Sequence, residues 1–245
     1  MSYIFKLDNI LTIIMYLSTI SLATFFSFLS DKFFKKEYRI LSFLFIILSF
    51  LCLFIPLAFR GYGIDHEAYL NIYKNINSKG YNYRGFPEPL FVLINYFVGH
   101  IFNNFQYIYI LSAFISLFFF YLAFYNLKRK INLSIFIWFF SITMYFYMYG
   151  LIRMFLAVSI IFYAYQYLEK DQKSIYLILC FVAGLFHYSA FIMIPLYFIF
   201  KINLFKIKIN NKLNISLSFY LLFIIFLFFL LFIYIFIFFF FIFFF

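Results

Sequence analysis

Residues 40–59 read ILSFLFIILSFLCLFIPLAF, an apolar run that contains no charged side chain. A helix of about twenty such residues is long enough to cross a hydrocarbon core of about 30 Å. The strands of a transmembrane barrel alternate apolar and polar residues instead, and this run does not. The stretch therefore predicts a membrane-spanning α-helix.

The composition of the whole chain agrees with that helix. Of its 245 residues, 68% are hydrophobic and 11% are charged, and the mean hydropathy is +1.04. A soluble domain is excluded because its surface must be polar. Similar apolar runs recur along the sequence, so we predict an all-α fold, a polytopic transmembrane helical bundle formed by residues 1–216. We expect about seven or eight membrane segments, some of them short or broken.

The net charge of +11 comes from basic residues that lie in short connections between the apolar runs. This distribution follows the positive-inside rule, so we expect no nucleic-acid partner. The basic clusters at 30–39 and 128–130 predict cytoplasmic loops, and the polar loop 60–88 then lies on the outer face. The spans expected on this basis are 10–29, 40–59, 105–127 and a hairpin of 131–149 and 151–168, whose tip faces outward.

Two apolar segments do not read as simple spans. Residues 89–102, PLFVLINYFVGHIF, are too short and predict a re-entrant or interfacial helix. Residues 175–200 as one span would place the four following lysines outside. Two shorter pieces that meet near 184–187 would keep those lysines inside, and we favour this broken form. A broken helix needs a protein or water cavity for its freed backbone groups.

The end of the chain, residues 217–245, is dominated by phenylalanine. It reads either as a last membrane helix or as the product of a truncation or frameshift, and no function is assigned to it. Both cysteines, Cys52 and Cys180, fall inside apolar runs without a metal or redox motif, so they read as small core residues.

Ionisable residues in or beside membrane segments are costly and indicate function. Arg153 has apolar neighbours on both sides and no acid nearby in the sequence, which favours an anionic partner over snorkelling to the interface. His187 follows the expected break of the last apolar segment. An isolated histidine is more often a satisfied core residue, but a break at this point favours a functional one. For His100 we prefer the plain structural interpretation.

The outer loop offers the other candidates. Asp65 and Tyr69 share a face if this segment is helical, because residues four apart are neighbours on a helix. Glu88 lies between two prolines that restrict its backbone, which suits general-base work or hydroxyl binding. Arg60 begins the loop. His66 and Glu67 are interpreted as solvated loop residues.

The sequence contains no nucleotide-binding P-loop, no nucleophile elbow and no zinc-protease motif. We also find no cluster of histidine and cysteine with metal spacing and no pair of acids suited to a divalent ion. We therefore expect a metal-independent site without a cofactor.

Four short motifs follow one another along residues 40–200: R-x-x-G-x-D-x-x-x-Y (60–69), E-P-x-F (88–91), I-R-x-x-x-A (152–157) and A-x-x-F-H-x-S-A (183–190), with Pro195 beyond. In this order they resemble the EpsG-like family of polysaccharide polymerases, which is related to the Wzy polymerases of O-antigen and capsule. The chain departs from the family pattern at Leu90 and Met154, where glycine and glutamine are common. Family members also usually carry further membrane segments.

The resemblance implies a glycosyltransferase-type polymerase in the bacterial inner membrane, with its active face outward. It would transfer a glycan from an undecaprenyl-diphosphate carrier onto a new lipid-linked repeat unit. Its partners would be that oligosaccharide, membrane lipid, a flippase and chain-length regulators. The binding residues would be Arg153, Arg60 and Tyr69. The base would be Asp65 or Glu88, with His187 next.

Three other functions stay open at this stage. A ligase acting on lipid-linked glycans would have the same architecture. A flippase or transporter of lipid-linked oligosaccharides would spread its charges through the bilayer and have more spans. An inactive, truncated membrane protein is the remaining alternative.

Overall fold

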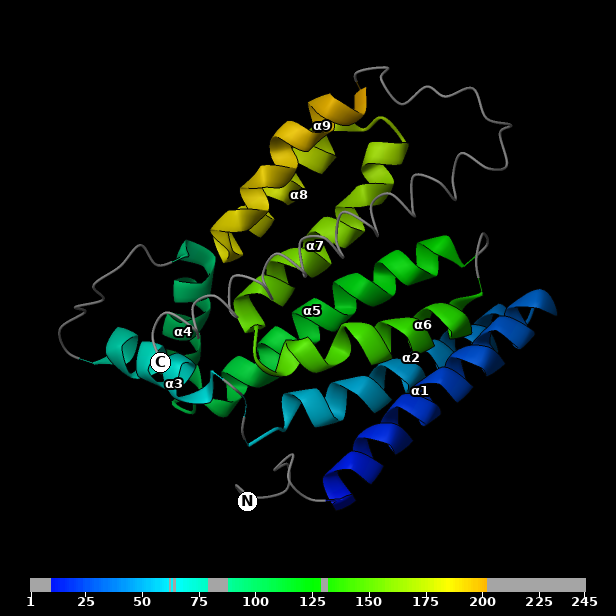
Figure 1. Ribbon diagram of the computed structural model, residues 1–245, viewed down its shortest axis with the longest axis horizontal. Coiled ribbons are helices and arrows are strands. Elements are labelled where there is room, and N and C mark those ends of the chain that lie inside the picture. The colour runs from blue at the N-terminus through cyan, green and yellow to red at the C-terminus, as the bar shows by residue number, and fades with distance from the viewer. Residues whose placement is uncertain (1–9, 62, 64, 79–87, 129–131, 202–245) are drawn as a thin grey trace, which may run out of the picture. The chain divides into compact units, whose positions relative to one another are not determined.

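The computed structural model describes residues 10–61, 63, 65–78, 88–128 and 132–201 (Figure 1). These residues contain helices and turns and no strand, so the predicted all-α fold is confirmed for this part of the chain. The predicted C-terminal segment 217–245 lies outside the described residues. The described α-helices are α1 (Ile10–Lys35), α2 (Arg39–Ala58), α3 (His66–Asn77), α4 (Pro89–Ile101), α5 (Gln106–Leu127), α6 (Leu133–Thr143), α7 (Ile152–Glu169), α8 (Lys173–Phe186) and α9 (Met193–Lys201).

Three of these helices are long and apolar enough to cross a membrane: α1 from Ile13 onward, α2 and α5. The predicted spans 40–59 and 105–127 therefore correspond to single helices. The larger number of seven or eight spans is not confirmed, because other apolar helices such as α4, α6 and α8 are shorter. At a rise of about 1.5 Å per residue, a helix the length of α6 covers only about half of the hydrocarbon core.

Two predicted boundaries were wrong. The first helix does not end at residue 29 but continues to Lys35, where basic side chains suit a helix C-terminus. The predicted span 131–149 divides into α6 and a 3₁₀ turn, Tyr145–Tyr149, and the Tyr145 hydroxyl of this turn donates to the Leu53 carbonyl at 2.7 Å. The polar loop 60–88 contains the amphipathic helix α3, which agrees with the helical form considered for Asp65 and Tyr69.

Buried hydroxyl groups tie the long helices together. The Ser49 hydroxyl of α2 donates to the Ala23 carbonyl of α1 at 2.8 Å and lies 2.9 Å from the hydroxyl of Tyr121 in α5. Small residues and hydroxyl contacts of this kind let membrane helices approach closely. Helices α1, α2, α5, α6 and α7 consequently lie alongside one another (Figure 1).

This packing gives the bundle two distinct ends. At one end the Gln106 amide of α5 donates to the Ala58 carbonyl of α2 at 2.7 Å. At the other end the Lys128 ammonium, just after α5, donates to the Ser42 hydroxyl of α2 at 2.6 Å. Helices α3 and α4 lie at the first end, beside the start of α5 (Figure 1). We call this first end the Glu88 end and the other the Lys128 end.

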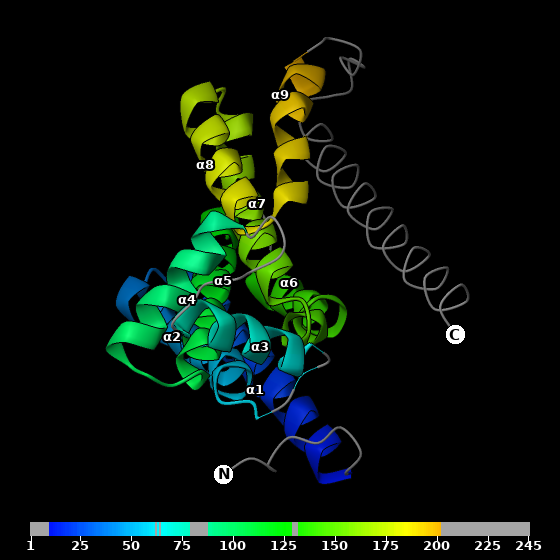
Figure 2. The same ribbon diagram turned by 90° about the vertical axis from the view of Figure 1, so that its left-hand side faces the viewer.

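The break predicted within 175–200 is confirmed. Helix α8 ends at Phe186, and His187 has an extended backbone with φ −156° and ψ 116°. A 3₁₀ turn, Tyr188–Ile192, follows and leads into α9. The Tyr176 hydroxyl donates to the Met193 carbonyl at 2.9 Å, so α9 returns beside α8 (Figure 2). His187 therefore lies at the tip of a hairpin whose two arms start and finish at the same end of the bundle.

The tight tip of this hairpin depends on Gly184. A Cβ at this position would lie 2.3 Å from Cε1 of the Phe191 ring, which is closer than real Cβ contacts. Glycine thus lets the 3₁₀ turn pack directly on α8.

We expect Gly184→Ala to lower the thermal stability of the purified protein by several degrees, because overpacking typically costs about 1–3 kcal/mol. Thermal unfolding in detergent measures this loss. The matched control is the same change in a Phe191→Leu background, where the smaller side chain removes the ring contact. An equal loss in both backgrounds would show that the Phe191 ring is not the cause.

Candidate functional site

Glu88 stands directly before the first turn of α4. Its backbone is extended, with φ −61° and ψ 119°, and its carbonyl accepts from Val92 N at 3.0 Å to begin the helix. Pro89 occupies the first helical position, where a missing N–H costs nothing. Glu88 is only 6% exposed, so this helix start directs its carboxylate inward.

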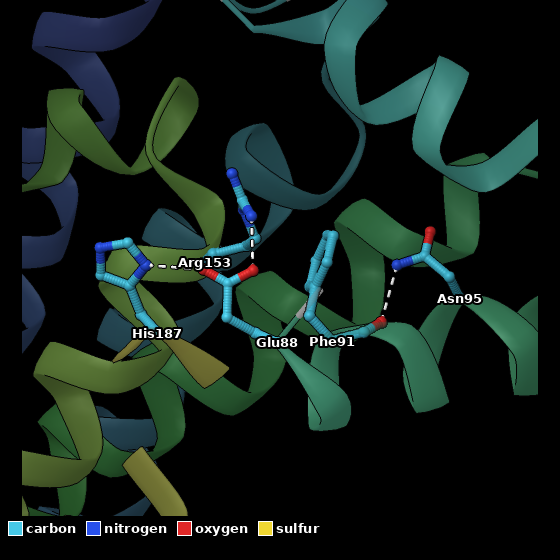
Figure 3. Close-up of polar contacts among 5 residues, drawn as sticks. All are labelled: Glu88, Phe91, Asn95, Arg153 and His187. Atoms are coloured by element: carbon cyan, nitrogen blue, oxygen red, sulfur yellow. Dashed lines mark hydrogen bonds and ion pairs between the residues drawn. The ribbon is translucent and has the colours of Figure 1, made fainter. Parts of the chain in front are cut away.

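The Glu88 carboxylate joins two side chains that are distant in the sequence (Figure 3). Its Oε2 accepts from Arg153 Nη1 at 2.5 Å, and its Oε1 lies 3.1 Å from His187 Nδ1. Arg153 is the second residue of α7, and His187 follows the last residue of α8. The ends of α4, α7 and α8 therefore meet at one carboxylate.

The pKa of Glu88 determines which atom carries the proton of its hydrogen bond with His187. Burial alone would raise this pKa, but the hydrogen bond with His187 and the charge of Arg153 outweigh it, so the pKa is lowered. The carboxylate is therefore ionised at neutral pH and can only accept hydrogen bonds. It follows that His187 Nδ1 is the donor, which leaves Nε2 as the nitrogen that can accept a proton.

Arg153 and His187 both remain accessible. The side chain of Arg153 is 30% exposed and that of His187 is 31% exposed, whereas that of Glu88 is 8% exposed. The Arg153 guanidinium lies 5.8 Å from the ring centroids of Tyr69 and of Phe91, within the range of cation–π attraction. The Arg153 cation is thus held by one carboxylate and two rings while part of its side chain stays exposed.

Tyr69 and Asp65 come from the start of α3. The Tyr69 amide donates to the Asp65 carbonyl at 3.0 Å, so the predicted helical relation between these two residues is confirmed. Tyr69 is 5% exposed and its ring packs edge-on against Phe91 at 5.7 Å. Burial raises the pKa of Tyr69, while Arg153 opposes that rise. Asp65 precedes α3 and is half-buried, and the charge of its carboxylate adds to the rise in the pKa of Tyr69.

The structure places Arg60 differently from Arg153. Arg60 is 2% exposed, its Nη1 donates to the Met148 carbonyl at 3.0 Å, and its guanidinium lies 4.2 Å from the Tyr109 ring centroid. Burial lowers the pKa of Arg60. Among the described residues no carboxylate forms an ion pair with it. In this geometry Arg60 fastens the outer loop to the bundle and takes no part in the ion pairs of Glu88.

The interpretation of His66 as a solvated loop residue was wrong. His66 is the first residue of α3 and its Nδ1 lies 2.7 Å from the Tyr109 hydroxyl. Glu67 is exposed, as expected. His100 Nδ1 lies 2.9 Å from the Tyr96 carbonyl of its own helix, which agrees with a structural role.

Tyr109 is the residue that sequence reasoning missed, since it contacts both Arg60 and His66. It lies inside the apolar run that forms α5, where tyrosine is common in this chain. Nothing in the local pattern separates it from the other tyrosines, so only the packing of α3 against α5 reveals its role.

Comparison with known proteins gives one match. No curated protein and no solved structure matches the chain. The model of the EpsG family matches residues 43–245, a range that includes Glu88, Arg153 and His187. The match covers most of the chain. The chain therefore belongs to the EpsG family, a family of membrane proteins of polysaccharide biosynthesis.

Proposed function

We propose that this protein polymerises lipid-linked oligosaccharide repeat units into a surface polysaccharide by glycosyl transfer from an undecaprenyl-diphosphate carrier. The observation that carries the proposal is the ionised Glu88, which binds an accessible arginine and an accessible histidine at one end of a membrane bundle. A cation and an oriented base are what transfer of a glycan from a diphosphate requires.

In the proposed reaction, an acceptor hydroxyl of the incoming repeat unit attacks the anomeric carbon of the growing glycan. The new glycosidic bond forms as the bond from that carbon to the diphosphate oxygen breaks. The hydroxyl proton passes to His187 Nε2, and the lipid diphosphate leaves with the bonding electrons. The step is a substitution at the anomeric carbon and involves no oxidation or reduction.

Arg153 is the group suited to the leaving diphosphate. A guanidinium stabilises the negative charge that develops on the departing oxygens, and its planar donors fit phosphate geometry. Its contacts with Glu88, Tyr69 and Phe91 fix its position before substrate arrives. Because this cation is preorganised, it needs little rearrangement during the reaction.

His187 is a better base than either carboxylate in this geometry. Glu88 is enclosed by its two partners, and its lowered pKa makes it a weaker base. Its function is to orient the imidazole, as a carboxylate orients histidine in many catalytic sites. Asp65 stands apart from these ion pairs. We therefore expect Asp65→Asn to keep most of the transfer activity.

The proposal extends to location and partners. The protein would lie in the bacterial inner membrane with the Glu88 end outward, because the basic loops lie at the Lys128 end. A flippase would deliver the repeat units to this face, and chain-length regulators would act on the product. Arg60 and Tyr69 would support the site by holding α3 and the outer loop in place.

Surface polysaccharide from a deletion strain tests this function. Loss of a polymerase leaves single repeat units on the surface, and the wild-type gene restores long chains. Loss of a flippase would instead leave no exported repeats. Loss of a ligase would leave long chains that are not attached to their final acceptor. Either of the last two outcomes, or long chains persisting in the deletion strain, would contradict the proposal.

A further inference from the structure

The Lys128 end contains a cavity of about 360 Å³ that the proposed reaction does not use. It lies where the C-terminal part of α1 and the turn between α1 and α2 meet Lys128 and Asn132. Its floor includes Lys128 and Asp31, and its rim includes Lys35, Glu37, Arg39 and Asn132. The volume lies within the range of small-molecule sites in proteins.

The floor of the cavity is held by hydrogen bonds and keeps a positive charge. Lys128 is 6% exposed, and its Nζ donates to the hydroxyls of Ser30 at 2.5 Å and Ser42 at 2.6 Å, which are neutral acceptors. The ammonium also lies 4.8 Å from the centroid of the Phe34 ring. Burial lowers the pKa of Lys128 to about 8, so the side chain is still mostly protonated at neutral pH.

The acid in the floor is already engaged. Asp31 is 8% exposed, and its Oδ2 accepts from the Ser134 amide at 3.0 Å and from the Ser134 hydroxyl at 3.2 Å. A carboxylate at the first turn of α6 is also favoured by the helix dipole. Asp31 therefore directs its carboxylate toward α6. Its negative charge also partly opposes the lowering of the pKa of Lys128 by burial.

The rim presents two exposed cations on either side of the turn between α1 and α2. Lys35 ends α1 and Arg39 begins α2, and the turn is closed by Glu37 with a positive φ of 64°. Glu37 is the one acid of the rim and is exposed. Two cations thus flank the opening above the buried Lys128, and the rim as a whole carries a positive charge.

Apolar side chains continue directly from this rim. Ile40 is 79% exposed and Phe43 is 53% exposed on the first turn and a half of α2. In a membrane protein, side chains of this kind face acyl chains. The opening therefore stands where a membrane surface meets its hydrocarbon core.

We propose that this cavity binds the phosphate group of an anionic phospholipid whose acyl chains lie along the exposed face of α2. Basic pockets between membrane helices bind anionic headgroups, and each basic side chain near the surface contributes about fivefold in affinity. Arg39 offers planar paired donors to the phosphate, and Lys35 offers a point charge. The buried Lys128 attracts the phosphate through its positive charge from the floor of the cavity.

The test measures thermal unfolding of the purified full-length protein in neutral detergent while phosphatidylglycerol is added. We expect wild-type protein to be stabilised by phosphatidylglycerol and much less by phosphatidylcholine. The double variant Lys35→Gln with Arg39→Gln should need more than about tenfold more phosphatidylglycerol for the same shift. The matched control is Lys32→Gln with Lys36→Gln, which removes two cations of the same segment that do not line the cavity. This control should raise the midpoint clearly less than the rim double variant does, because Lys32 and Lys36 can contribute only through the general surface field and not through contact with the phosphate.

Glu37→Gln gives a test of opposite sign. Removing the acid of the rim should strengthen phosphatidylglycerol binding, because a like charge beside the phosphate is lost. Equal losses in the two double variants would indicate a diffuse surface field and overturn the site. If inorganic phosphate alone raised the unfolding temperature as much as phosphatidylglycerol does, the bound phosphate would not need to come from a lipid, and the proposal would be overturned. The opposite result would be weaker binding by Glu37→Gln together with a preference for phosphatidylethanolamine. It would show that Glu37 binds a headgroup ammonium, and it would overturn the proposal of an anionic lipid.

Discussion

Arg153→Ala is expected to lower the rate of glycan polymerisation by at least about a hundredfold. Removing one preorganised group that stabilises developing charge typically costs about a hundredfold to a thousandfold in rate. Arg153 is the accessible cation bound to Glu88, and two rings hold its guanidinium in place. The initial rate of chain growth with purified lipid-linked repeat units measures this loss.

A control must separate this catalytic loss from unfolding, because the Arg153→Ala change also leaves Glu88 with only one of its two partners. Arg153→Lys keeps the charge but loses the planar donors, so it should recover stability more fully than rate. Thermal unfolding of both variants provides the comparison. If Arg153→Ala keeps the wild-type rate while remaining folded, Arg153 has no role in the reaction.

His187→Ala is expected to lower the rate by about a hundredfold to ten-thousandfold, which is the usual contribution of a positioned general base. Glu88→Gln should have a smaller effect, because the amide can still contact the imidazole but no longer stabilises its protonated form. His187→Gln is a size-matched variant that retains hydrogen bonding without a base, so its rate should stay as low as that of His187→Ala.

The double variant of Glu88→Gln and His187→Ala shows whether the two residues act together. Groups that work as one unit give losses that do not add, so the double variant should be slower than His187→Ala only by the part of the Glu88→Gln loss that comes from its contact with Arg153. The initial rates of the four proteins form a double-mutant cycle. Fully additive losses would mean that Glu88 acts independently of His187.

The sequence predicted those parts of the fold that follow from length and hydropathy. The runs at 40–59 and 105–127 are apolar throughout and form α2 and α5. The break at His187 was also predictable, because unbroken helix would have carried the following lysines to the outer face. The shortness of α6 was not predictable, since the apolar sequence continues through the 3₁₀ turn that follows it, where Tyr145 contacts Leu53 in another helix.

The sequence named candidate residues for the site but not their geometry. Arg153 and Glu88 are separated by long stretches of sequence, so nothing local marks them as partners. Arg60 and Arg153 look alike in the sequence because each adjoins an apolar run. Only packing separates them, since Arg60 is enclosed by aromatic rings and Arg153 keeps an open face.

The most direct test of the central claim uses purified protein in liposomes supplied with undecaprenyl-diphosphate-linked repeat units. The length distribution of the products is read on a gel. We expect a ladder of long chains from the wild type and from Asp65→Asn, and only single units from Arg153→Ala and His187→Ala. Wild-type ladders from both Arg153→Ala and His187→Ala would contradict the account.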